Sequence, residues 1–185
     1  MGLLSIIRKQ KEKDSEIRVL VLGLDNSGKT TIIRKLMGCD TQSVAPTMGF
    51  QIHTFAWQDF HINAWDIGGQ LTLRSFWGNY FDSVDVVVWV VDGTSVERLH
   101  ELYDELRSKV VQQEQLAGTY FCVAINKTDL VADLQLALVR HSVEASLRLL
   151  AEIPADRYTV KCVSGRDGRG LVELMEWITS KFQAP

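Results

Sequence analysis

The sequence is poor in cysteine and lacks the patterns of a secreted or membrane-spanning protein. Its 185 residues contain three cysteines, Cys39, Cys122 and Cys162, which stand far apart. None belongs to a Cys-x-x-Cys pair, so neither a disulfide framework nor a zinc site is expected. No apolar run approaches the roughly 18 residues that a membrane helix needs. We therefore expect a cytoplasmic protein in a reducing compartment.

Positive charge is also too scarce to indicate nucleic-acid binding. The net charge is −3, and no basic block occurs beyond the first thirteen residues. The first six residues lack the long apolar core of a secretion signal. The last four residues, Phe182 to Pro185, offer no cysteine for a prenyl group. Any contact with membranes is therefore expected to be weak and peripheral, through the N-terminus.

The N-terminal segment, residues 1–15, differs in pattern from the rest of the chain. Its apolar residues fall on one side of a helix and its basic residues around the remainder; they are Leu3, Leu4, Ile6 and Ile7, and Arg8, Lys9, Lys11 and Lys13. This pattern fits a helix packed on the domain. It fits equally well an amphipathic helix that leaves the domain to meet a membrane or a partner groove.

Residues 16–185 have the length of one domain and the alternation of an α/β fold. Short apolar runs predict strands, and amphipathic stretches between them predict helices. The run from Val84 to Val91 is almost entirely β-branched, as in a strand buried on both faces. Strands are expected at 17–22, 50–57, 61–65, 84–91, 120–125 and 158–163, and helices at 29–37, 97–115, 133–150 and 170–182. A tight turn at Gln58-Asp59 predicts an antiparallel hairpin.

A phosphate-binding loop follows the first predicted strand. Residues 23–30 match G-x-x-x-x-G-K-[ST] and open the first predicted helix, the context in which this motif binds a nucleoside triphosphate. Backbone N–H groups and the positive helix end would surround the phosphates, with Lys29 on the β- and γ-phosphates. The expected binding residues are Gly23, Leu24, Asp25, Asn26, Ser27, Gly28, Lys29, Thr30 and Thr31.

Two further segments supply a magnesium site and a catalytic residue. Thr30, Thr47 and Asp66 carry the oxygen ligands that Mg²⁺ prefers, Asp66 standing at the end of a strand. The Gly69 N–H would approach the γ-phosphate, and the Gln70 amide would orient the attacking water. Gln70 and Lys29 are therefore the expected catalytic residues.

The residues after the fifth predicted strand indicate guanine as the base. The carboxylate of Asp129 would accept hydrogen bonds from the N1–H and 2-amino groups of guanine, a donor pair that adenine lacks. The stem of Lys127 would lie along the base, and Asn126 would tie this loop to the phosphate loop. A backbone N–H from Cys162, Val163 or Ser164 is expected to meet the guanine carbonyl.

These motifs together resemble the Ras superfamily, and the residues between them resemble its Arf branch. The resemblance rests on residues 23–30, on Pro46 to Phe50 and on Trp65 to Gln70, while residues 1–7 and 73–81 indicate an Arf-like subgroup. It implies a P-loop small G-protein domain: a six-stranded, mostly parallel sheet with helices on both faces. It also implies a GTP-binding switch whose hairpin slides in register when GTP binds and displaces the N-terminal helix.

The resemblance further implies the partners of this switch. Phe50, Trp65 and Tyr80 match an aromatic trio that effectors contact in the GTP form, and Arg74 is expected to point toward effectors. Carriers of lipidated cargo and tubulin-folding cofactors are the implied effectors, alongside activating and exchange proteins. A monomer that reaches membranes or microtubule-organising regions peripherally is the expectation.

Two departures from the family pattern and one absence qualify this expectation. Ile6 stands where the acylation pattern wants Ser or Thr, so we expect little myristate on Gly2. The stretch from Gly165 to Gly170 looks longer and more basic than the usual turn. No arginine occurs between Cys39 and Thr47, so hydrolysis is expected to be slow, about 10⁻⁴ s⁻¹, and to depend on an arginine from an activating protein.

The sequence also fits two other functions. A P-loop kinase would share the phosphate loop but would need an arginine-bearing lid and no Asn126–Asp129 motif. A module that exchanges nucleotide without useful hydrolysis would use Gln70 only as a structural residue. Replacing Gln70 by leucine separates the second alternative from a GTPase.

Overall fold

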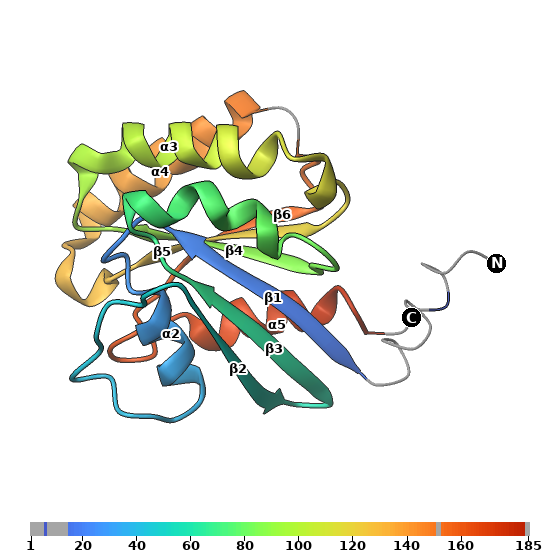
Figure 1. The fold of residues 1–185 in the computed structure, drawn as a ribbon. Coiled ribbons are helices and arrows are strands. Elements are labelled where there is room, and N and C mark those ends of the chain that lie inside the picture. Colours follow the sequence, from blue (N-terminus) through green and yellow to red (C-terminus); the bar gives the residue numbers. More distant parts are fainter. Residues whose placement is uncertain (1–5, 7–14, 151–152, 184–185) are drawn as a thin grey trace.

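The computed structural model describes residue 6 and residues 15–150 and 153–183, and a six-stranded sheet forms its centre (Figure 1). The strand order is β2-β3-β1-β4-β5-β6. The strands are β1 (Glu16–Gly23), β2 (Phe50–Trp57), β3 (Phe60–Ile67), β4 (Val86–Asp92), β5 (Tyr120–Asn126) and β6 (Tyr158–Cys162). All neighbouring pairs are parallel except β2 and β3. The predicted fold class is confirmed.

Helices cover both faces of this sheet (Figure 1). One face packs against α3 (Leu99–Leu106), α4 (Asp133–Leu150) and the 3₁₀ segment η1 (Leu71–Tyr80). The other face packs against α2 (Lys29–Leu36) and α5 (Leu171–Ser180). The hydrophobic core is therefore divided into two layers by the sheet, as expected for a parallel sheet with crossover helices.

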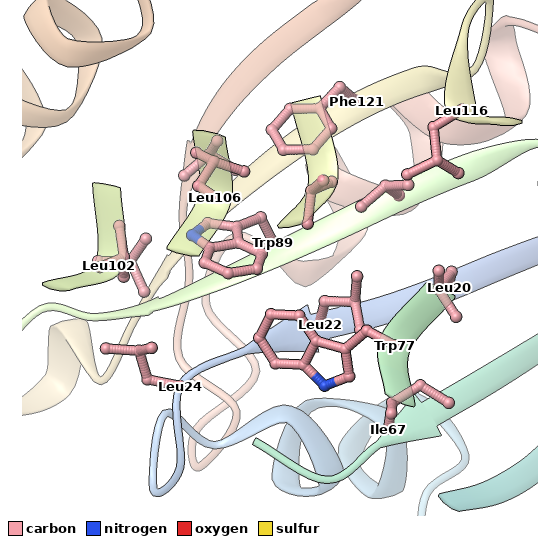
Figure 2. Close-up of a cluster of buried hydrophobic side chains, with 14 of the residues drawn as sticks. Leu20, Leu22, Leu24, Ile67, Trp77, Trp89, Leu102, Leu106, Leu116 and Phe121 are labelled. Atoms are coloured by element: carbon pink, nitrogen blue, oxygen red, sulfur yellow. The ribbon is translucent and has the colours of Figure 1, made fainter. Parts of the chain in front are cut away.

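The central strand β4 shows how the sequence produces these two layers. Val86, Val88 and Val90 point into the layer under α2 and α5. Val87, Trp89 and Val91 point into the opposite layer, where the Trp89 ring meets Trp77 of η1 edge to face, with centroids 5.7 Å apart (Figure 2). A strand with period-two side chains and apolar residues on both faces up to its last position must be covered twice.

The hairpin of β2 and β3 was also predicted correctly. Its register runs from Phe50 opposite Ile67 to Trp57 opposite Phe60. The turn uses Gln58, whose φ of 50° lies in the left-handed region that a two-residue hairpin turn requires. The structure shows one register of this hairpin, so the sliding implied by the family resemblance stays a prediction.

The predicted helix at 97–115 is interrupted. A 3₁₀ turn, η2 (Val96–Arg98), precedes α3, a π-helical turn, η3 (Arg107–Val111), follows it, and a separate 3₁₀ turn, η4 (Glu114–Leu116), ends the segment. The buried residues Leu102, Leu106 and Val110 are each four apart, and this spacing overshoots an α-helical turn of about 3.6 residues. The wider π turn corrects the overshoot and keeps Val110 in the core.

We predict that the α5 layer carries a large share of the stability. Leu174 is 1% exposed, so its replacement by alanine should lower the free energy of unfolding by about 3 kcal/mol. Val172 lies on the same helix and is 51% exposed, so Val172→Ala is the matched control. It should change the free energy of unfolding by less than about 0.5 kcal/mol. Denaturant unfolding of the nucleotide-bound protein measures both; equal losses would contradict this packing.

The predicted binding motifs stand at or after the carboxyl ends of β1, β3, β5 and β6, except Thr47, which precedes β2. Parallel strands bring their carboxyl ends together at one edge of the sheet, which is where ligands of such sheets bind. The predicted N-terminal helix lies outside the described residues except for Ile6 and Ser15, so the boundary at residue 15 stays a prediction. Within the described residues, none of the helices combines the length and the apolar composition that crossing a bilayer requires.

Candidate functional site

The phosphate loop connects β1 to α2, and Lys29 lies at its centre. The Lys29 side chain is buried, and its Nζ donates hydrogen bonds to the carbonyl oxygens of Gly23 (3.1 Å) and Leu24 (2.9 Å). Burial lowers the pKa of the Lys29 ammonium to about 8, although Asp66 opposes this shift. The loop is thus curled around a cation that few water molecules reach, and anionic phosphate oxygens would stabilise its charged form.

Gly28 and Asn126 fix the shape of this loop. Gly28 has φ 90°, and a Cβ there would stand 2.2 Å from Nδ2 of Asn126. That Nδ2 donates to the Ser27 carbonyl (2.9 Å), and the Asn126 Oδ1 accepts from the Gly165 N–H (2.9 Å). Asn126 therefore ties the loop after β5 to the phosphate loop, as predicted, and also to the loop after β6.

Three predicted metal ligands converge beside Lys29. The Thr30 Oγ1 lies 2.8 Å from the Thr47 Oγ1 and 2.5 Å from the Asp66 Oδ2, and the Thr47 Oγ1 lies 3.2 Å from the same Oδ2. Asp66 is fully buried, and its Oδ1 has no hydrogen-bond partner among the described residues. Such a set of hard oxygen atoms, one of them buried and unsatisfied, fits Mg²⁺.

Gly69 and Gln70 follow this cluster and lie against the phosphate loop. A Cβ on Gly69 would come within 2.3 Å of the Gly23 carbonyl oxygen, so only glycine allows this approach. The Gln70 Nε2 lies 3.6 Å from the Met48 sulfur, beside the loop that carries Thr47. The structure thus places Gln70 at the mouth of the predicted phosphate site, and its role in orienting water stays a prediction.

The predicted base site is assembled by the loops after β5 and β6. The Ser164 Oγ donates to the Asp129 Oδ1 (2.8 Å), which holds the carboxylate in place. The Lys127 Nζ donates to the Asn26 carbonyl (2.7 Å) and to the Asp92 carboxylate (2.7 Å). Burial raises the pKa of the Asp92 carboxyl. Hydrogen bonds from Lys127 and Thr94 outweigh this effect and bring the pKa below its usual value. The second lone pair of the Asp129 Oδ1 and the whole of Oδ2 are left to accept from the two donors of a ligand.

The prediction for the last strand needs correction. The Val163 N–H donates to the Ile125 carbonyl and the Ser164 N–H to the Arg169 carbonyl, each at 2.8 Å, so neither is left for guanine. Cys162 is half-buried in β6, where burial raises the pKa of its thiol. Ser164 acts instead through its hydroxyl. Sequence reasoning missed Gly165, which contacts Asn126 and packs against α2; its place directly after Ser164 was the available signal.

The predicted direction of Arg74 is wrong. Its side chain points inward and is 2% exposed. The guanidinium donates to the Gly69 carbonyl and pairs with Asp25, Glu101 and Glu105. Two carboxylates of α3 and one of the phosphate loop surround this cation, which the sequence alone does not show.

The aromatic trio forms one cluster, and its contact with effectors stays a prediction. The Phe50 ring stacks on Trp65 with centroids 5.9 Å apart, and Tyr80 lies 5.2 Å from Phe50 and 6.2 Å from Trp65. The Arg18 guanidinium covers the Trp65 ring at 4.1 Å. Phe50 is 46% exposed, so the cluster is not a sealed core and presents an aromatic surface to solvent.

Comparison with known proteins identifies the relatives of this chain. Residues 3–182 match the sequence profile of the ADP-ribosylation factor family. ADP-ribosylation factor-like protein 2 of Arabidopsis thaliana is 43% identical, covering 96% of this chain and 94% of that protein. ADP-ribosylation factor-like protein 3 of Chlamydomonas reinhardtii is 41% identical, covering 99% of this chain and all of that protein. The subgroup indicated by residues 1–7 and 73–81 was ADP-ribosylation factor-like protein 2, and this is confirmed.

A solved structure gives the same result for the fold. The small GTPase Arl6 BBS3 of Trypanosoma brucei, with the bound nucleotide analogue GppNp, is similar with a TM-score of 0.74 at 25% identity. The match covers 90% of this chain and 97% of that one. The family match favours the switch protein over the P-loop kinase.

Proposed function

Because this chain belongs to the ADP-ribosylation factor family, and is thus a Mg²⁺-dependent GTPase that binds GTP and GDP, we propose that its GTP form recruits effectors through Phe50, Trp65 and Tyr80. One observation carries this proposal. Each ring is joined in sequence to a residue at the predicted γ-phosphate and Mg²⁺ site. Phe50 follows Thr47 by three residues, Trp65 precedes Asp66, and Tyr80 ends the segment that begins after Gln70.

This connection lets the nucleotide control the surface. Thr47 and Asp66 meet directly across the predicted metal site, so release of the γ-phosphate and Mg²⁺ would free both segments. The rings they carry would then lose their common arrangement. Ordering of two loops by the γ-phosphate is a recurrent device in switch proteins.

We assign the steps of hydrolysis to residues as follows. Lys29 and the N–H groups of the phosphate loop bind the β- and γ-phosphates, while Thr30, Thr47 and Asp66 would hold Mg²⁺. Bound Mg²⁺ supplies charge neutralisation on the phosphate oxygens. Gln70 orients the attacking water from the mouth of the site. Arg74 follows Gln70 but is engaged in ion pairs with Asp25 and Glu101, so it is not available to stabilise charge on the γ-phosphate. We therefore propose that an activating protein donates an arginine.

We predict that Gln70→Leu locks the protein in its GTP form. The leucine cannot hydrogen-bond a water molecule, so the single-turnover rate of hydrolysis, with an activating protein present, should fall by at least about 100-fold. The affinity for GTP should stay within about twofold, because the hydrogen bond of the Gln70 side chain among the described residues goes to the Met48 sulfur and not to the phosphate loop. Phosphate release and nucleotide titration measure the two quantities.

Two outcomes would contradict this assignment. An unchanged rate in the leucine variant would make Gln70 structural. Rapid single turnover by the isolated wild-type chain would remove the need for a donated arginine. The catalytic and binding readouts are independent, so either result is interpretable alone.

We propose that the effectors are carriers of lipidated cargo and tubulin-folding cofactors. Similarity to ADP-ribosylation factor-like protein 2 supports this choice. The protein would then act as a cytoplasmic monomer that reaches membranes or microtubule-organising regions peripherally. A pull-down should compare Gln70→Leu loaded with GTP, wild type loaded with GDP, and Gln70→Leu/Phe50→Ala loaded with GTP. Retention of the same proteins by all three would refute the aromatic surface.

A further inference from the structure

Two side chains of η1 hold successive peptide groups at the start of the segment that approaches the γ-phosphate. The Trp77 Nε1 donates to the Gly68 carbonyl oxygen (3.1 Å). The Arg74 Nε donates to the Gly69 carbonyl oxygen (2.9 Å). Both side chains are buried, Trp77 fully and Arg74 to within 2%. Buried donors on consecutive carbonyls fix two adjacent peptide planes.

Fixing these planes also fixes the groups that face the nucleotide. A peptide group is planar and trans, so the N–H points opposite to the C=O of the same unit. Trp77 therefore sets the direction of the Gly69 N–H, and Arg74 sets the direction of the Gln70 N–H and the start of its side chain. Gly69 has no room to rotate on the other side, since a Cβ there would lie 2.3 Å from the Gly23 carbonyl oxygen.

Arg74 is itself anchored on three sides. Its Nη1 lies 2.8 Å from a Glu101 oxygen and 3.3 Å from a Glu105 oxygen, and its Nη2 lies 3.2 Å from the Asp25 Oδ1. A guanidinium presents its donors in a rigid planar fork, so carboxylates on one side fix the Nε–H on the other. Arg74 thus connects α3 and the phosphate loop to the Gly69 carbonyl.

We propose that Arg74 and Trp77 are positioning residues that strengthen the binding of a triphosphate without strengthening the binding of a diphosphate. Together they orient the Gly69 N–H and Gln70 toward the γ-phosphate, which GDP lacks. The proposal concerns the nucleotide alone and is independent of the effectors proposed above. It does rest on the assignment of the Gly69 N–H to the γ-phosphate.

The test compares two nucleotides on each variant. Arg74→Lys retains the charge that Glu101 and Glu105 need, but one ammonium cannot serve those carboxylates and the Gly69 carbonyl together. Trp77→Phe keeps a smaller aromatic ring in the core and removes the donor to Gly68. Each variant should lose about tenfold in affinity for a fluorescent non-hydrolysable GTP analogue with Mg²⁺ and stay within about twofold for the matching GDP analogue.

Arg98→Lys is the matched control. Arg98 contacts the same Asp25 and Glu101 but touches neither Gly68 nor Gly69. Its replacement should change the affinities for both nucleotides by the same factor, leaving their ratio at the wild-type value. Melting temperatures of the GDP-bound proteins verify folding. Equal losses of affinity for both nucleotides in Arg74→Lys and Trp77→Phe would show a purely structural role and overturn the proposal. Unchanged affinity for both nucleotides in these two variants would overturn it as well.

Discussion

Replacement of Lys29 by methionine is expected to weaken the binding of GTP by about a thousandfold or more. The Lys29 ammonium is buried within the phosphate loop, with its Nζ on the carbonyls of Gly23 and Leu24. An ion pair at about 4 Å contributes roughly 4 kcal/mol at an effective dielectric constant near 20, and two phosphates share this cation. Methionine fills the same space without the charge.

The same replacement should leave the nucleotide-free protein folded and no less stable. Burial lowers the pKa of Lys29 to about 8, below its ordinary value, so the fold disfavours the charged form. Proton binding at Lys29 therefore favours the unfolded chain, and stability without nucleotide is lost as the pH falls through the window between about 10.5 and about 8. Methionine cannot take up this proton. At neutral pH, the melting temperature of the Lys29→Met protein without nucleotide should therefore equal or exceed that of wild type.

Lys35→Met controls for loss of a lysine from the same helix. Lys35 lies in the last turn of α2, away from the phosphate loop. The Lys35→Met protein should therefore bind GTP as wild type does. Isothermal titration with GTP and thermal unfolding without nucleotide separate the two effects. A Lys29→Met protein that binds GTP as tightly as the control would refute the assignment of Lys29 to the phosphates.

The phosphate loop and the sheet could be predicted because their signals are local. Each apolar run that the sequence predicts as a strand forms one, and the glycine pattern between Gly23 and Gly28 occurs where a strand meets a helix. In β4 the apolar run from Val86 to Val91 predicts burial on both faces, and both core layers include its side chains. Short-range pattern and long-range packing agree at these positions.

Arg74 could not be predicted because its carboxylate partners come from distant parts of the chain. Its acceptors are Gly69, Asp25, Glu101 and Glu105, which belong to three different segments. An arginine after a loop resembles a surface residue until the fold brings carboxylates around it. The segment η1 was missed for a related reason, since a 3₁₀ stretch buries only Arg74 and Trp77 and leaves no helical period to detect.

The N–H groups near the base were misassigned because their partners depend on a turn. The Ser164 N–H closes the turn to Arg169, and Gly168 then donates back to the Ser164 carbonyl. A sequence motif states which residues are close, but it does not state which of their backbone groups are already paired. The side-chain role of Ser164, on Asp129, follows only once both loops are placed.

Replacement of Asp129 by asparagine is expected to change the base that the protein selects. The carboxylate accepts from two guanine donors, N1–H and the 2-amino group, whereas an asparagine amide offers one acceptor and one donor pair. Its donor would face the 2-amino group, so affinity for GTP should fall by about a thousandfold or more. Xanthine carries a carbonyl at that position, so the variant should prefer xanthosine triphosphate over GTP. Competition of both nucleotides against a fluorescent analogue measures the reversal.

The hydrogen bond between Ser164 and Asp129 predicts a smaller loss of GTP affinity when Ser164 is replaced than when Asp129 is replaced. The Ser164 Oγ holds one carboxylate oxygen at 2.8 Å, so Ser164→Ala should weaken GTP binding by about tenfold without admitting xanthosine triphosphate. Asp156→Asn makes the same chemical change on an exposed residue in the segment before β6 and should alter neither affinity. Guanine remains the preferred base in both of these proteins. If Asp129→Asn still preferred GTP, or if wild type bound ATP as tightly as GTP, a residue other than Asp129 would select the base.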